Sequence, residues 1–121
     1  MEKDILKEKM DGFAKGVYDV TKKFPRDEIY GITSQLRRAA LSVILNYVEG
    51  FARTGNKELK NFLQISYGSL KETKYLIFFC TREKYMTKKE YETLMALTDE
   101  IGAMLWKRIQ GIKEKIAKDN Q

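Results

Sequence analysis

The chain has 121 residues, enough for one hydrophobic core, and its 43% hydrophobic and 33% charged residues are typical of a globular protein. It contains no histidine, which excludes histidine-dependent serine and cysteine catalysis, histidine zinc sites and the Glu-x-x-His di-iron motif of helical bundles. The net charge of +6 favours anionic partners, although lysines are interspersed with acidic residues along every segment, as on an ordinary solvated surface.

Two features indicate the compartment. The N-terminal segment 1–4 contains three charged residues and no signal-peptide core follows it, while no apolar stretch approaches the roughly 18 residues of a membrane span. The single Cys80 cannot form an internal disulfide and lies in the apolar run 75–80, where a buried thiol behaves as a small hydrophobe. We therefore expect a cytoplasmic protein that is neither exported nor embedded in a membrane.

The first half of the chain predicts two helices. Apolar residues recur at alternating spacings of 4 and 3 through residues 4–23, the period of a helix packed along a bundle seam. Pro25 ends this helix, because the residue before a proline is pushed out of the helical region. The second helix spans about 27–53, and Asp27, Thr33 and Ser34 are its candidate N-caps.

The second half predicts two more helices. The turn residues 54–56 separate a third helix, about 57–82, from the second, and the capping box from Thr87 to Glu90 begins a fourth, about 88–116. The remaining tail is polar and expected to fray. Since short connections make neighbouring helices antiparallel, we predict an all-α fold, an up-down-up-down four-helix bundle forming a single domain over residues 1–121.

The second and third helices carry more apolar surface than one bundle core can bury. The second is apolar around most of its circumference. In the third, Tyr75, Phe78 and Phe79 share a sector with lysines, which favours a subunit interface and a homo-oligomer. The alternative is a tightly wrapped monomer that buries both faces. The apolar residues of the second helix are Ala39, Ala40, Leu41, Val43, Ile44, Leu45, Tyr47, Val48 and Phe51.

A polar stripe about 80° wide interrupts the apolar surface of the second helix. Short polar residues in mid-helix favour specific partners, and Ser69 and Glu72 of the third helix are the candidates. We predict a buried structural network in which Glu72 meets Arg38 or Arg53 and Asn46 meets Ser69; the alternative is an anion or nucleic-acid site. The stripe consists of Gln35, Arg38, Ser42, Asn46, Glu49 and Arg53.

Two further interpretations concern the same region. Glu49 and Glu72 are candidate Mg²⁺ ligands of a nuclease, but no further carboxylate cluster accompanies them, and we do not favour this site. Gly50 and Gly68 lie inside helices, where each costs about 1 kcal/mol relative to alanine. Close approach of the two helices would explain both.

Residues 24–72 resemble the four-helix bundle family named after proteins encoded in intervening sequences of 23S ribosomal RNA genes. Tyr47 departs from this pattern, in which an aliphatic residue is expected. The resemblance implies a bacterial protein that forms ring-like pentamers and has no established enzymatic activity. It also implies a distant similarity to the accessory proteins of diversity-generating retroelements, which bind a reverse transcriptase and nucleic acid. The matching residues are Phe24-Pro25, Glu28, Tyr30-Gly31, Thr33-Ser34-Gln35, Arg37-Arg38-Ala39-Ala40, Ser42, Asn46, Glu49-Gly50, Arg53, Glu58, Phe62-Leu63, Gly68-Ser69-Leu70 and Glu72.

The functional hypothesis is a non-enzymatic, oligomeric interaction module that binds RNA or DNA through a basic surface including Lys57, Lys60, Lys107 and Arg108. Its alternative is a purely structural or protein-recruiting scaffold, and the metal-dependent nuclease is a distant third. We expect no cofactor, no metal and no small-molecule substrate.

Overall fold

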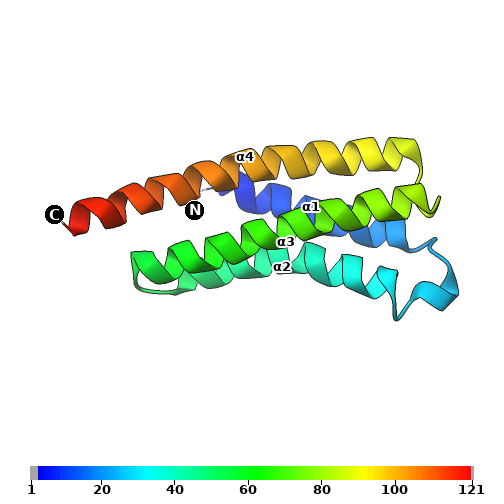
Figure 1. The fold of residues 1–121 in the computed structure, drawn as a ribbon, viewed down its shortest axis with the longest axis horizontal. Coiled ribbons are helices and arrows are strands. Elements are labelled where there is room, and N and C mark those ends of the chain that lie inside the picture. The colour runs from blue at the N-terminus through cyan, green and yellow to red at the C-terminus, as the bar shows by residue number, and fades with distance from the viewer. Residues whose placement is uncertain (1–2, 121) are drawn as a thin grey trace.

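The computed structural model describes residues 3–120, which form four α-helices, one short 3₁₀ turn and no strand. The all-α prediction is confirmed. The chain reverses direction at each connection, so that consecutive helices run in opposite senses (Figure 1). The elements are α1 Ile5–Thr21, the 3₁₀ turn Arg26–Glu28, α2 Ile32–Ala52, α3 Asn56–Arg82 and α4 Lys88–Asp119.

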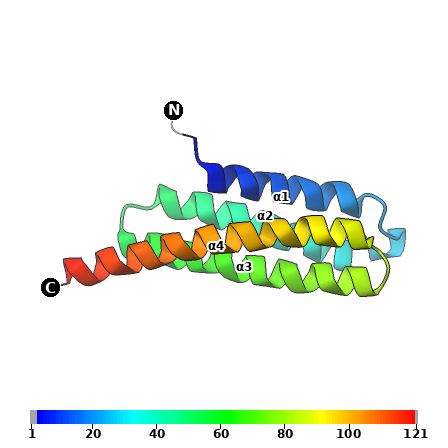
Figure 2. The ribbon, with the colours of Figure 1, turned by 90° about the horizontal axis from the view of Figure 1, so that it is seen from above.

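The helices pack in a closed circuit around one core. α1 contacts α2 and α4, and α3 contacts the same two helices. The C-terminal part of α4 extends past the α2–α3 connection, as both ribbon views show (Figures 1 and 2). None of these helices offers the long apolar stretch that a bilayer crossing requires. Fully buried core side chains come from all four helices and include Leu6, Met10, Phe13, Leu36, Leu63, Leu70, Ile77, Ile101, Leu105 and Ile109.

Side chains cap two of the helices. Asp4 precedes α1 and its Oδ1 accepts a hydrogen bond from the backbone N–H of Lys7 at 3.1 Å. At the start of α4 the predicted capping box is present: Glu90 N donates to Thr87 Oγ1 at 3.1 Å, and Thr87 N donates to Glu90 Oε1 at 2.9 Å. Each cap satisfies backbone donors that the first helical turn leaves without partners.

The start of the second helix differs from the prediction of residue 27. The segment after Pro25 closes as a 3₁₀ turn, in which Glu28 N donates to Pro25 O at 3.0 Å, and α2 begins only at Ile32. Its N-cap is Gly31, so none of the three polar candidates caps the helix. The short turn redirects the chain before α2, a rearrangement that helix periodicity alone does not encode.

The end of α4 also differs from the prediction of residue 116. The helix continues to Asp119, because Ile109, Ile112 and Ile116 continue the apolar face of α4 into its last turns. Lys118, expected to fray, is therefore helical. Gln121, the last residue of the expected tail, lies outside the described residues, as do Met1 and Glu2 of the charged N-terminal segment.

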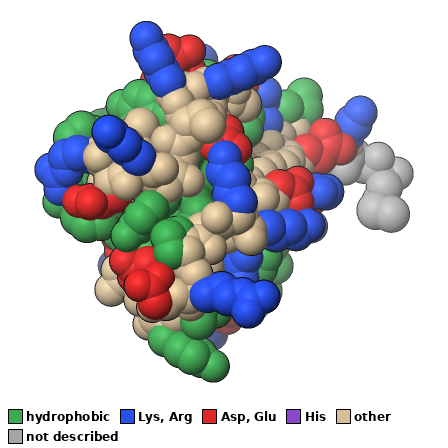
Figure 3. Space-filling view, turned by 90° about the vertical axis from the view of Figure 1, so that its right-hand side faces the viewer, with side chains coloured by type: hydrophobic (Ala, Val, Ile, Leu, Met, Phe, Trp, Pro, Cys, Tyr) green, Lys and Arg blue, Asp and Glu red, His purple; other side chains and the backbone are tan. Residues whose placement is uncertain are grey.

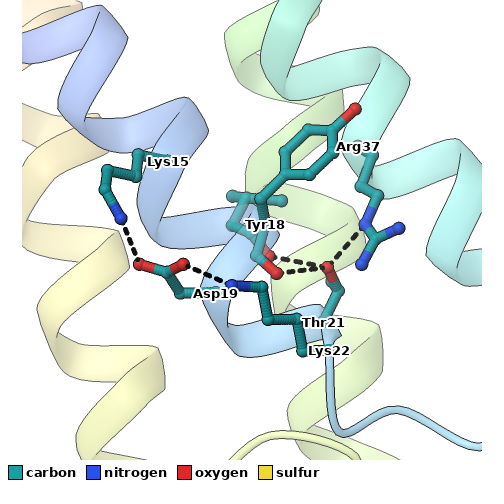
Figure 4. A network of polar contacts seen from close by, with 7 residues as sticks. Lys15, Tyr18, Asp19, Thr21, Lys22 and Arg37 are labelled. Carbon is teal, nitrogen blue, oxygen red and sulfur yellow. Dashed lines mark hydrogen bonds and ion pairs between the residues drawn. The ribbon is translucent and has the colours of Figure 1, made fainter.

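A polar network fixes the end of α1 against α2 (Figure 4). Arg37 Nε of α2 donates to Thr21 Oγ1 at 2.8 Å, and this hydroxyl donates to Val17 O at 2.8 Å. The Arg37 guanidinium also lies 4.8 Å from the centroid of the Tyr18 ring. Beside them Lys15 and Lys22 hold the pKa of Asp19 below its ordinary value by hydrogen bonds to its carboxylate.

The single cysteine lies on the core side of α3. Cys80 is fully buried, and burial, followed by the negative charge of Glu28, raises the pKa of its thiol to about 11. The thiol is therefore neutral near pH 7 and a poor nucleophile. Cys80 serves packing, as its apolar sequence context predicts.

Candidate interaction surfaces

The short polar residues of the stripe join α2 to α3. Ser42 Oγ and Ser69 Oγ lie 2.7 Å apart, while Asn46 Nδ2 donates to the Ser42 carbonyl and to Ser42 Oγ, both at 2.9 Å. Asn46 therefore reaches α3 only through Ser42, whereas the sequence predicted a direct contact with Ser69. These three side chains are half-buried at the edge of the helix pair.

The charged members of the stripe face solvent in the single chain. Arg53 donates to Glu49 Oε1 one turn earlier, at 2.5 Å, and does not meet Glu72. Arg38 and Glu72 are exposed, and neither has an ion-pair partner within residues 3–120. The prediction of a network buried within one chain is therefore wrong for its charged residues, because the stripe follows the edge of the α2–α3 contact and not its centre.

Arg38 and Glu72 line a shallow groove of about 390 Å³ between α2 and α3, which we call the α2–α3 groove. Ser42 and Ser69 line the same groove about one turn along each helix from the two charges. Both an uncompensated cation and an uncompensated anion are thus presented on one surface. The groove is lined by Gln35, Arg38, Ala39, Ser42, Ser69 and Glu72.

Apolar side chains continue this surface toward the α2–α3 connection. Leu45 is 61% exposed and Ile65 is 50% exposed. Because Ser42 stands opposite Ser69 in the helix pair, Leu45 and Ile65, about one turn further along each helix, come level with each other. Val48 and Phe51, nearer the connection, are also exposed. In the opposite direction along α3, Tyr75 and Phe78 are exposed and Phe79 is half-buried. We use the name α2–α3 outer face for the α2–α3 groove together with Leu45, Val48, Ile65, Gly68 and Tyr75.

The two interior glycines have different surroundings. A Cβ added at Gly50 would lie 3.0 Å from Phe62 Cβ and 3.2 Å from Leu59 Cδ1, so α3 approaches α2 closely there, as predicted. At Gly68 nothing lies within 4 Å, and the predicted close approach is wrong at that position. Gly68 is exposed on the α2–α3 outer face, where its lack of a side chain has no explanation within one chain.

In a second polar cluster, unlike in the α2–α3 groove, the charged side chains are paired with each other. The buried Tyr47 hydroxyl donates to Asp4 Oδ2 at 2.7 Å and accepts a hydrogen bond from Arg108 Nη1. Arg108 also pairs with Asp4 at 3.5 Å and lies over the Tyr47 ring. The tyrosine that departs from the family pattern thus holds the N-cap of α1 to α4. The guanidinium of Arg108, a predicted nucleic-acid contact, already has protein partners.

Basic residues of α3 are sorted onto one side of the helix. At 100° per residue, a sector of about 100° contains five basic residues and no acidic one, while both acidic residues of α3, Glu58 and Glu72, fall outside it toward α2. We call the five basic residues of α3 the basic stripe: Lys57, Lys60, Lys71, Lys74 and Arg82. Lys107, on α4, is exposed but does not belong to it.

At one end of the molecule the charges are mixed. Seen from the end that carries the α1–α2 and α3–α4 connections, basic side chains project in several directions with acidic and hydrophobic ones between them (Figure 3). Within residues 3–120 no three acidic or cysteine side chains converge where they could hold a metal ion.

Sequence reasoning did not single out the aromatic pair beside the basic stripe. Tyr67 of α3 and Trp106 of α4 have ring centroids 5.6 Å apart, and both line a hollow between the two helices. The signal that could have found Tyr67 is its position in the same helical sector as Lys60 and Lys71. Trp106 could be placed opposite Tyr67 only once the packing of α3 against α4 was known.

Comparison with known proteins identifies the fold family. The model of the family "23S rRNA-intervening sequence protein" matches residues 2–107. A crystal structure of a protein of unknown function from the S23 ribosomal protein family of Bacteroides thetaiotaomicron has a similar fold, with a TM-score of 0.81 and 24% identity over 87% of this chain and 98% of that chain. No curated protein matches. The chain is therefore a member of the 23S rRNA-intervening sequence protein family.

Proposed function

We propose that this protein is a non-enzymatic interaction module whose copies associate through the α2–α3 outer face and which presents its basic stripe to nucleic acid. The expected assembly is a ring-like homo-oligomer of five chains in the cytoplasm. The observation that carries the proposal is the combination of Leu45 and Ile65, both at least half exposed, with the unpaired charges of Arg38 and Glu72 on the same face.

Self-association would bury the exposed apolar side chains of this face, pair its charges and explain its glycine. Burying the exposed half of a leucine or isoleucine side chain contributes on the order of 1 kcal/mol. Arg38 and Glu72 would find opposite charges on another copy, which gives an interface its orientation. Gly68 would admit a neighbouring backbone at a point where the chain itself places nothing.

The mass of the native protein in solution tests self-association. Light scattering across micromolar concentrations should give a mass near five times the 14.2 kDa of the chain. A different multiple would revise the subunit number only. A mass of 14.2 kDa throughout the concentration series would overturn the proposed assembly.

Nucleic-acid binding is the second part of the proposal, and the basic stripe supports it. The five cations of α3, of which Lys74 is paired with Asp99 of α4, are spread over about 37 Å of helix and suit a polyanion better than a small anion. Assembly would multiply the net charge of +6 by the number of copies. A protein-recruiting scaffold remains the competing function, and it would leave the basic stripe solvated.

Anisotropy titrations with a labelled duplex DNA and a structured RNA, at about 50 and 200 mM salt, test this part. We expect binding that weakens steeply with salt, and a weaker salt dependence for Lys57→Gln and Lys60→Gln, because each removes one phosphate contact. Lys7→Gln of α1 removes the same charge away from the stripe and is the matched control. Absence of binding near 50 mM salt would leave the scaffold function.

A further inference from the structure

A hollow between α3 and α4 lies within the basic stripe. The hollow is open to solvent and has a volume of about 320 Å³. Tyr67 and Trp106 form its walls, with their ring planes inclined by 48°. Trp106 is 51% exposed, so a large part of an aromatic ring is open to solvent. We call this hollow the aromatic groove.

Gly102 of α4 lines the aromatic groove and contributes no side chain to it. A Cβ added at Gly102 would be 3.5 Å from Leu70 Cδ2, an ordinary contact, so packing against Leu70 does not require a glycine there. Trp106 is the ring that remains accessible to a flat group from outside the chain, because about half of its side chain is exposed.

The charge around the aromatic groove is positive. The Lys71 ammonium lies 5.2 Å from the centroid of the Tyr67 ring. Lys74 pairs with Asp99 at 3.0 Å, which neutralises the one acidic residue that lines the groove. Lys71 has no ion-pair partner among residues 3–120 and remains available for an anion. A phosphate beside the rings would thus meet a cation.

We propose that the aromatic groove binds an unpaired base of single-stranded nucleic acid, which stacks against Trp106 and Tyr67 while its phosphates follow the basic stripe. This inference rests on the nucleic-acid part of the proposed function. Cations alone attract any phosphate backbone, but aromatic faces bind bases only where the bases are not already stacked in a duplex. The groove therefore gives the basic stripe a preference for single strands.

Trp106 is the only tryptophan of the chain, so its fluorescence reports stacking directly. The protein is titrated with a single strand of about 12 nucleotides, within the roughly 4–16 nucleotides of single-strand sites, with a duplex of equal length, and with a mononucleotide. We expect saturable quenching by the single strand and little by the duplex. The mononucleotide should quench only at much higher concentration, because it lacks the phosphates that contact the stripe.

Variants assign the effect to the groove, with anisotropy of the labelled strands as the readout. Trp106→Leu and Tyr67→Leu should each weaken single-strand binding about 5- to 150-fold and leave duplex binding unchanged. Tyr30→Leu is the matched control, because Tyr30 is 96% exposed and precedes α2, outside the groove. Lys71→Gln should reduce the magnitude of the single-strand salt slope by about 0.7. Circular dichroism of each variant beside the parent checks that the variant is folded.

Two results would overturn the inference and are distinguishable. If single strand and duplex bind equally, without quenching and without loss in Trp106→Leu, the aromatic groove is not a base site, while nucleic-acid binding through the basic stripe stands. If neither strand binds near 50 mM salt, the nucleic-acid part of the proposed function fails together with the inference.

Discussion

Asn46 and Tyr47 are neighbours on α2, yet they belong to polar clusters of opposite character. Tyr47 points into the bundle, where its hydroxyl joins Asp4 to Arg108 and every charge has a partner. Asn46 points to the edge shared with α3, where the serines are bonded to each other but Arg38 and Glu72 have no partner in the described chain. The first cluster holds the fold together, and the second presents its charges to something outside the chain.

The largest expected effect comes from breaking the closed cluster. Tyr47→Ala removes a fully buried aromatic ring and should lower the free energy of unfolding by about 3–5 kcal/mol. Tyr47→Phe keeps the ring and removes only the hydroxyl, which should lower it by about 1–2 kcal/mol. Chemical denaturation of the two variants beside the parent measures both values. Equal midpoints for Tyr47→Phe and the parent would show that the cluster does not stabilise the fold.

The two glycines compare the centre of the α2–α3 contact with its outer face. Gly50→Ala forces a methyl group against Phe62 and should destabilise the chain by about 1–3 kcal/mol. Gly68→Ala has open space and should stabilise a dissociated chain by up to about 1 kcal/mol through helix propensity. Denaturation at dilute protein measures both, because assembly otherwise contributes to stability.

On the proposed assembly, Gly68→Ala should also weaken self-association, since its methyl group enters the contact between copies. Gly50→Ala serves as the comparison in the same light-scattering series. A Gly68→Ala protein that assembles as tightly as the parent would remove Gly68 from the interface.

The smallest expected effect on the fold is that of Glu72→Ala. Because Glu72 is exposed and has no partner within the described chain, its loss should shift the melting temperature at dilute protein by no more than about 3 °C. At concentrations where copies associate, the same substitution should lower the melting temperature more. Thermal melts at two protein concentrations test this expectation. A large shift at both concentrations would support the buried network that the sequence predicted.

The helices were predictable from sequence because apolar spacing and the capping box at Thr87 and Glu90 are local signals. The excess apolar surface of α2 was also visible, and Leu45 and Val48 are indeed exposed. What sequence could not supply is the rotation of each helix against its neighbours. That rotation turns Arg37 toward Thr21 and leaves its neighbour Arg38 exposed.

Contacts between residues far apart in the chain could not be predicted from the sequence either. The cluster of Asp4, Tyr47 and Arg108 forms only when α1, α2 and α4 pack together. From the sequence alone, Arg108 was therefore interpreted as a free surface cation. The difference between Gly50 and Gly68 has the same origin, since it depends on where α3 crosses α2. The aromatic groove, too, is formed by two helices whose residues lie far apart in sequence.

The size of two charge variants in solution tests self-association through the α2–α3 outer face most directly. Ile65→Lys places a charge on this face, and Ile5→Lys places the same charge on α1 at nearly equal exposure, 50% against 53%. Sedimentation velocity of both variants beside the parent is the measurement. We expect Ile65→Lys to sediment as a folded monomer while Ile5→Lys keeps the parent's size; equal sizes for all three proteins would contradict the proposed interface.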